Sequence, residues 1–188
     1  MRFAWSRFAI YFLLFAALGQ ALVSGAKRPN ILLIVSEDNG PELGCYGDPY
    51  VKTPVLDRLA ANGIRFNRAY VPQAGCSQSR AALLTGLYPH QNGQIGLATW
   101  KFRLYDENTP NLIRSLKQAG YRTGIIGKLH INPASAFPFD VKKISSANFS
   151  RKKLGAYAFE AGRFIKESDR PFFLSVNYPD AHRPFLKT

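Results

Sequence analysis

Apolar runs separated by polar breaks divide the chain into an alternation of strands and helices. Continuous apolar runs predict strands at residues 30–35, 122–126 and 172–176. The first of these runs, bounded by Pro29 and a polar cluster, is typical of a strand buried on both faces. Residues 64–70 alternate apolar with polar side chains, which predicts a strand with one wetter face.

Three helices are predicted between these strands. Thr53-Pro54 places a capping residue before a proline at the first helical position, and this helix should end at Gly63. Thr109-Pro110 repeats the device, and Gly120 closes that helix. A third helix covers residues 154–167. The side chains expected to face the core are Leu56, Leu59, Ala60, Leu112, Ile113, Leu116, Tyr157, Ala161, Phe164 and Ile165. Strands that alternate with helices indicate an α/β fold, a mostly parallel sheet with helices on both faces.

The first 26 residues follow a different pattern. A basic start to Arg7, an apolar segment over residues 8–18 and small residues at 23–26 are typical of a secretory signal peptide. The apolar segment is shorter than the roughly 20 residues that cross a bilayer, so no stable membrane span is expected, with an uncleaved anchor as the alternative. We therefore expect residues 1–26 to be a signal peptide and residues 27–188 to form one domain.

The chain is strongly basic, with a formal net charge of +13. Such a charge attracts polyanions, and an exported protein meets sulfated polysaccharides more often than nucleic acid, so no nucleic-acid partner is expected. Part of the excess positive charge lies in Lys142-Lys143 and in Arg151-Lys152-Lys153, which are expected in a solvated loop.

One short stretch combines several reactive side chains. Cys76-Ser77-Gln78-Ser79-Arg80 runs directly into the helix-favouring Ala81–Leu84. Cys76 therefore lies at a helix N-terminus, where free N–H groups and the macrodipole favour an anion. The alternatives are a small buried hydrophobe, or a disulfide with Cys45, the other cysteine of the chain.

Further polar residues follow the predicted strands. Parallel strands share one carboxyl edge, so residues at the strand exits can converge with the helix start into a catalytic site. Adjacent carboxylates there suit a hard divalent cation such as calcium. The residues concerned are Glu37 and Asp38, Lys128 and His130, His182, and Cys76 with Arg80.

These motifs resemble the signature of the type I sulfatases. The family pattern is Cys-x-Pro-Ser-Arg followed by a Leu-Thr-Gly turn, and Gln78 stands where the family usually has proline. HQNG after the turn, GYRTGIIGKLH and RPFFLSVNYPDAHRP are most similar to the heparan N-sulfatase (sulfamidase) branch. The similarity extends from about Pro29 to the last residue.

The resemblance implies an alkaline-phosphatase-like fold and a defined set of cofactors. A maturation enzyme would convert Cys76 to formylglycine, whose hydrate is the nucleophile. One calcium ion would be held by Glu37, Asp38 and the residue derived from Cys76. The family completes this metal site with an Asp-Asn pair further downstream, so the 188 residues are expected to be the amino-terminal, incomplete part of a sulfatase catalytic domain.

The resemblance also implies roles for the remaining site residues. Arg80 would hold the formylglycine hydrate and Lys128 the sulfate oxygens. His182 would protonate the leaving oxygen or amine, and His130 would remove a proton from the remaining hydroxyl.

The expected function is therefore hydrolysis of a sulfuric ester or sulfamate on a sulfated sugar or glycan, in the periplasm, outside the cell or in a lysosome. The alternatives are a phosphoryl or phosphonate hydrolase of the same superfamily, a cysteine hydrolase that uses unmodified Cys76, and an exported polyanion-binding protein without catalysis. The sequence indicates nothing about the oligomeric state.

Overall fold

The computed structural model describes residues 28–145, 153–183 and 185. The expected signal peptide lies outside the described residues, as do Arg151 and Lys152. The chain divides into two units, residues 1–30 and 31–188, and every helix and strand named below belongs to the second. Among the described helices none has the length and apolar character needed to cross a membrane.

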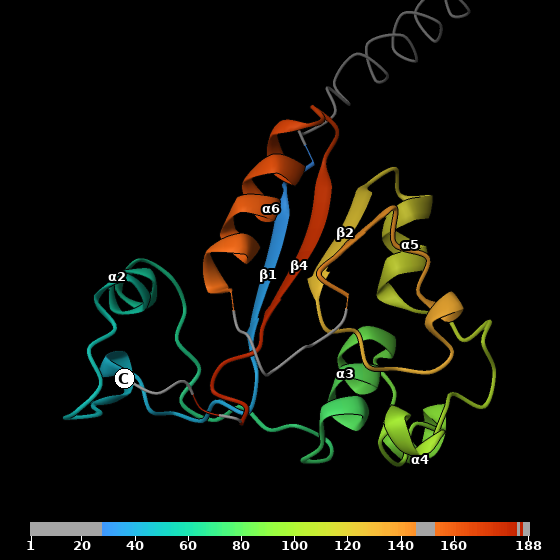
Figure 1. Ribbon diagram of the computed structural model, residues 1–188, viewed down its shortest axis with the longest axis horizontal. Helices are drawn as coiled ribbons and strands as arrows, with labels where there is room; N and C mark the ends of the chain where they lie inside the picture. Colours follow the sequence, from blue (N-terminus) through green and yellow to red (C-terminus); the bar gives the residue numbers. More distant parts are fainter. Residues whose placement is uncertain (1–27, 146–152, 184, 186–188) are drawn as a thin grey trace, which may run out of the picture. The chain divides into compact units, whose positions relative to one another are not determined.

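The described residues of the second unit form a four-stranded sheet in which every pairing is parallel. The strands are β1 (Ile31–Ser36), β2 (Arg122–Gly127), β3 (Val141–Lys143) and β4 (Phe172–Tyr178). Their order is β1-β4-β2-β3, and Figure 1 shows β1, β4 and β2 side by side. The predicted parallel sheet is therefore confirmed.

Helices occupy the connections between these strands. The α-helices are α2 (Pro54–Asn62), α3 (Cys76–Thr85), α4 (Pro89–Asn92), α5 (Leu112–Gln118) and α6 (Leu154–Lys166). The short 3-10 helices are η1 (Gly44–Tyr46), η2 (Ala98–Trp100) and η3 (Ala134–Ala136).

The apolar core lies on both faces of the sheet. Ile125 of β2 packs in one cluster with side chains of α3 and α5, including Ala81 and Ile113. Its neighbour Ile126 packs in a second cluster with Tyr157 and Phe164 of α6. Because successive side chains of a strand point to opposite faces, the two clusters show helices on both faces, as predicted.

Strand β1 is less covered than its sequence predicted. Leu32 and Ile34 are 49% and 57% exposed. Among the described residues β1 pairs with β4 alone, so it is the edge of this sheet. An apolar run therefore predicted the strand correctly, but the expected burial on both faces is wrong within the described part of the chain.

The segment around α2 also departs from the prediction. The helix begins at Pro54 and ends before Gly63 as expected, but it buries none of its residues, and Leu56 and Leu59 are exposed. Residues 64–70 form no strand, and Ile64 is 84% exposed. The alternating pattern lacks a neighbouring strand there, and β-propensity without a pairing partner does not make a strand.

The start of α5 is shifted from its predicted position. Asn111, rather than Thr109, is the capping residue, and its side chain accepts a hydrogen bond from the Arg114 N–H at 3.2 Å. Ile113 is buried, whereas Leu112 is exposed. The predicted close at Gly120 is confirmed by its left-handed backbone, with φ of 85°.

Two further predictions are corrected near the end of the chain. α6 follows its predicted range closely and buries Tyr157 and Phe164, but Ile165 is exposed. Lys142 and Lys143 belong to strand β3, not to a loop. A three-residue strand is too short for a periodic pattern to reveal it.

Candidate active site

The strand register brings the predicted site residues to one edge of the sheet. Val35 of β1 and Gly127 of β2 are both paired with Asn177 of β4, so the strands end at the same level. Glu37 and Lys128 follow within two residues of these positions. The exits of β1 and β2 therefore converge, as the parallel topology predicts.

Three buried charged side chains form the centre of the site. The Glu37 carboxylate accepts hydrogen bonds from Lys128 Nζ at 2.6 Å and from Arg80 Nη2, each at a separate oxygen. Burial acts to raise the pKa of Glu37, but the charges of Arg80 and Lys128 outweigh it, and the pKa lies below its usual range. Two cations thus face one carboxylate, and their excess positive charge favours an anion.

Asn177 fixes the position of Arg80. Arg80 Nη1 donates to Asn177 Oδ1 at 2.7 Å and to the Lys128 carbonyl at 2.8 Å. Asn177 Nδ2 in turn donates to Ser175 Oγ at 3.0 Å. Sequence reasoning missed Asn177; the available signal was a polar residue in a buried strand, which requires a partner.

Cys76 occupies the first position of α3, as predicted. Gly75 is its N-cap with extended backbone, and the Gln78 side chain fills the space that a Cβ at Gly75 would enter. Cys76 and Cys45 are both free thiols, so they are not bridged. Burial raises the pKa of the Cys76 thiol, and its hydrogen bond with Glu37 acts in the same direction. The thiol is therefore protonated at neutral pH, whereas reactive cysteines have a lowered pKa.

The two predicted histidines lie in different surroundings. His130 is half-buried in a left-handed backbone conformation, with φ of 55°. Burial and the charge of Lys128 lower the pKa of His130, so its ring is neutral at neutral pH. Its Nδ1 is buried without a hydrogen-bond partner among the described residues. His182 Nε2 lies 3.7 Å from Asp38 Oδ2, and its Nδ1 contacts the Arg183 carbonyl.

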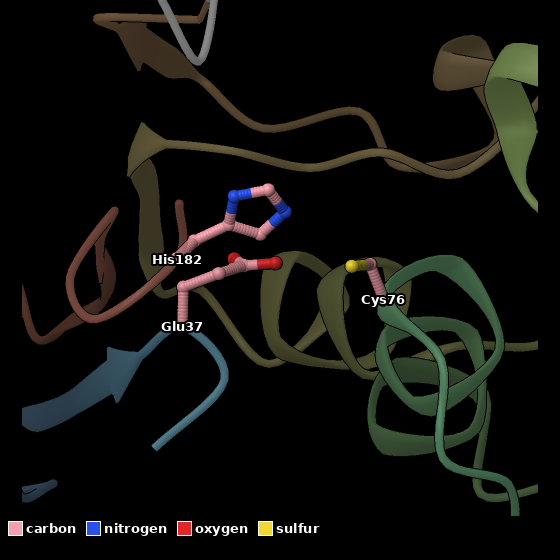
Figure 2. Close-up of side chains that lie close together, drawn as sticks. All are labelled: Glu37, Cys76 and His182. Carbon is pink, nitrogen blue, oxygen red and sulfur yellow. The ribbon is translucent and has the colours of Figure 1, made fainter. Parts of the chain in front are cut away.

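The groups that could hold a metal ion are not quite those expected. Ligand atoms of Glu37, Cys76 and His182 lie within 4.8 Å of one another, and Figure 2 shows these three side chains gathered together. Asp38, expected beside Glu37, has a side chain 55% exposed and lies outside that group. Its positive φ of 53° turns the chain directly after Glu37.

A cavity of about 680 Å³ opens beside these residues. Its lining includes Glu37, Asp38, Cys76 and Arg80, and residues 70–72 form part of its wall. This volume lies within the range of pockets that hold small organic ligands. A parallel sheet therefore presents a buried, positively charged anion site, a helix-start cysteine and a ligand-sized cavity at one edge.

These features define a hydrolase-like site at the carboxyl edge of an α/β sheet. The sulfatase family model matches residues 29–188, and the chain belongs to the sulfatase family. The resemblance drawn from the motifs is thereby confirmed, and members of this family generally use formylglycine and a divalent cation.

Two relatives illustrate the similarity. The chain is 39% identical over 165 residues to human N-sulphoglucosamine sulphohydrolase. The aligned region covers 84% of the chain and 32% of that protein. It is 41% identical over 108 residues to an N-acetylgalactosamine-6-O-sulfatase of Bacteroides thetaiotaomicron, covering 56% of the chain and 21% of the relative. The chain thus spans about a third or less of the length of these relatives.

Solved structures share the fold. One, determined in complex with its substrate D-glucosamine-2-N,6-O-disulfate, matches with a TM-score of 0.68 and 27% identity over 85% of this chain and 36% of its own. The phosphonate monoester hydrolase of Agrobacterium radiobacter matches with a TM-score of 0.68 and 25% identity over 84% of this chain and 42% of its own.

Proposed function

We propose that this protein hydrolyses a sulfuric ester or sulfamate of a sulfated sugar or glycan, with a formylglycine derived from Cys76 as nucleophile. The observation that carries the proposal is the buried cluster in which Arg80 and Lys128 share the single carboxylate of Glu37 beside Cys76. A sulfate needs such a preorganised positive site. The relatives that act on N-sulfoglucosamine and on sulfated N-acetylgalactosamine support this substrate class.

Formation of the nucleophile requires a maturation enzyme. Conversion of the Cys76 side chain to an aldehyde breaks the carbon–sulfur bond, releases the sulfur as sulfide and oxidises the carbon by two electrons, so this enzyme must also supply an oxidant. Water then adds to the aldehyde to form a hydrate with two hydroxyl groups. The second hydroxyl is what distinguishes this nucleophile from an ordinary serine or cysteine, which could not expel a bound sulfate.

The protein's side chains then divide the reaction into two steps. In the first, the oxygen of one hydroxyl at position 76 attacks sulfur and its proton passes to solvent, while the bond from sulfur to the leaving oxygen or nitrogen breaks. Arg80 and Lys128 stabilise the sulfate oxygens, and His182 donates a proton to the departing oxygen or amine. In the second, His130 takes the proton of the remaining hydroxyl. The aldehyde carbonyl re-forms, the bond from carbon to the sulfate oxygen breaks, and sulfate leaves.

A calcium ion would be held by Glu37, Asp38 and the oxygen that replaces the Cys76 sulfur. Carboxylate oxygens at adjacent positions fit a hard cation, although Glu37 lies one methylene further out than the aspartate usual in the family. When bound, the ion would hold sulfate oxygens and make the attacking hydroxyl more acidic. The side chain of Asp38 is exposed and lies outside the group formed by Glu37, Cys76 and His182. It would have to turn toward Glu37 to bind the same ion.

One alternative has a specific observation in its favour. The structural match to a phosphonate monoester hydrolase indicates that a related site can act on phosphorus. Relative turnover of sulfate and phosphonate esters with the same leaving group separates the two functions. A cysteine hydrolase is disfavoured, because the raised pKa of Cys76 leaves its thiol protonated. A non-catalytic polyanion-binding protein would not need the buried Glu37.

We further propose that residues 1–26 are a signal peptide and that residues 27–188 belong to the sulfatase catalytic domain. Export would bring the protein to the periplasm, the cell exterior or a lysosome, where sulfated glycans are met. The high positive charge supports a polyanionic substrate chain.

The proposal is tested with the full-length protein, produced together with a formylglycine-generating enzyme. We expect it to hydrolyse 4-nitrophenyl sulfate and glucosamine N-sulfate, and Cys76→Ala to abolish both activities. Cys45→Ala is the matched control, since Cys45 is also a free thiol but is no part of the site. Full activity of Cys76→Ala, or turnover of phosphonates alone, would contradict the proposal.

A further inference from the structure

A second cavity, of about 360 Å³, borders the active site without containing its nucleophile. His130 belongs to its lining, but Cys76 and Arg80 do not. Its other polar lining residues include Thr99, Asn132 and Lys142. An apolar floor with a few polar groups at the margin is typical of ligand sites.

The chain segment after β2 separates this cavity from the reaction centre. Lys128 extends to Glu37 in the buried cluster. The residues on either side of it, Gly127 and Leu129, line the cavity, as does His130. One short segment therefore forms both the back of the sulfate site and a wall of the second cavity. A ligand that reaches past His130 would contact both.

Hydrogen bonds made by Asn132 and Gln94 hold another part of the lining in place. The backbone N–H of Asn132 donates to Gln94 Oε1 at 3.1 Å, and Asn132 Nδ2 donates to the Ala98 carbonyl at 2.8 Å. Gln94 is fully buried, and its Nε2 donates to the Phe102 carbonyl at 3.0 Å. A wall fixed in this way needs little ordering when a ligand binds.

The charge of the cavity is positive. Lys142 lines it, and none of its described lining residues is acidic. Lys143, the next residue of β3, acts electrostatically on Glu167, just past the end of α6. Since successive side chains of a strand point to opposite faces, the two lysines are directed apart, and only Lys142 serves this cavity.

We infer that this cavity binds a second anionic group of the substrate, a sulfate or a carboxylate carried by the same glycan as the sulfate that is removed. The inference rests on the proposed function, because it takes the sulfate at Cys76 as the first anchor. Lys142 would supply the charge, and the Thr99 hydroxyl a hydrogen bond. His130, whose Nδ1 has no hydrogen-bond partner in the described part of the chain, belongs to the lining of this cavity.

Kinetics of the full-length protein provide the first test. The substrates are 4-nitrophenyl sulfate, glucosamine N-sulfate, its 6-O-sulfated form, and a disaccharide in which glucosamine N-sulfate is linked to a uronate. Lys142→Ala should lower kcat/KM about tenfold more for a substrate with a second anion than for 4-nitrophenyl sulfate, as expected from loss of one charge-assisted contact. Loss with the disulfated sugar identifies a sulfate as the second group, and loss with the disaccharide identifies a carboxylate.

The matched control is Lys143→Ala, which removes the same charge from the opposite face of β3. For this variant, the ratios of kcat/KM between the substrates should equal those of the wild type. Equal ratios for the Lys142→Ala and Lys143→Ala variants would overturn the inference.

A binding measurement keeps this inference separate from the proposed function. Calorimetric titration of the Cys76→Ala protein with the disulfated sugar and with the disaccharide requires no turnover. Adding Lys142→Ala should weaken binding of at least one of them about tenfold, and added salt should reduce the difference. If the wild type hydrolyses no sulfate compound, the proposed function fails, and this titration still decides whether the cavity binds anions. Unchanged affinity would refute the subsite.

Discussion

Replacement of Asn177 by leucine tests whether the hydrogen bonds of this buried amide hold Arg80 in the active site. Asn177 is buried in β4, where its Oδ1 accepts from Arg80 Nη1 at 2.7 Å and its Nδ2 donates to Ser175 Oγ at 3.0 Å. Its Nδ2 also donates to the Ile126 carbonyl at 3.3 Å. Leucine has nearly the same size and removes all three bonds. Arg80 keeps its contacts with Glu37 and with the Lys128 carbonyl.

The magnitude follows from the three lost hydrogen bonds, of which the one from Arg80 involves a charged group and the other two are neutral. A bond to a charged group contributes about 1.5–3 kcal/mol and a neutral bond about 1 kcal/mol to the free energy of unfolding. Leucine recovers part of this through its apolar surface, while the buried Ser175 hydroxyl loses its donor. We expect a net loss of about 2–3 kcal/mol for Asn177→Leu. Ser175→Ala removes only the neutral bond between Asn177 and Ser175 and should cost about 1 kcal/mol.

Urea unfolding of the full-length protein measures both changes. The midpoint should fall for Asn177→Leu without a change of slope, and it should fall less for Ser175→Ala. The hydrolytic rate of Asn177→Leu should also decline, because Arg80 loses the contact that fixes its side chain. A cost below about 0.5 kcal/mol for Asn177→Leu, or an equal cost for both variants, would refute the reasoning.

Three further outcomes are expected. Asp38→Asn should lower calcium affinity and activity together, because it removes a charged oxygen ligand while preserving shape; unchanged activity after exhaustive chelation would rule out the metal assignment. His182→Ala should lose far more rate on glucosamine N-sulfate than on 4-nitrophenyl sulfate, whose leaving group needs little protonation, and equal losses would remove His182 from the acid role. Burial acts to raise the pKa of Asp140, but hydrogen bonds from Lys117 and Thr123 outweigh it and lower the pKa. Its stabilising contribution is therefore present above the unfolded pKa of about 3.9 and is lost as the pH falls through the lower folded value, so wild type and Asp140→Asn should converge in unfolding free energy in acid.

The position of the site could be predicted because it depends on topology. Apolar runs and capping signals were sufficient to predict parallel strands, and parallel strands share one edge. Glu37 and Lys128 are near each other for that reason, although they are far apart in the chain, and Arg80 contacts Glu37 from helix α3. The position of Cys76 at a helix start followed from local pattern alone.

The remaining features depend on long-range contacts that no local pattern contains. An apolar run such as that of β1 is the same whether one or both faces are covered. The role of Asn177 arises only when β4 lies between β1 and β2. Glu37 and Asp38 are adjacent in sequence, which gave no sign that their side chains would lie apart. Their separation depends on the positive φ at Asp38, a backbone conformation that the local sequence pattern did not predict.

The proposed mechanism depends on conversion of Cys76 to formylglycine, which mass spectrometry of the tryptic peptide over residues 69–80 detects as a change of mass. In an active preparation of the full-length protein, we expect the aldehyde at position 76. Gln78→Pro should leave the aldehyde fraction equal or higher, because it restores the family pattern at a first-turn position where helices tolerate proline. An active preparation in which this peptide carries only a thiol or a disulfide would contradict the mechanism.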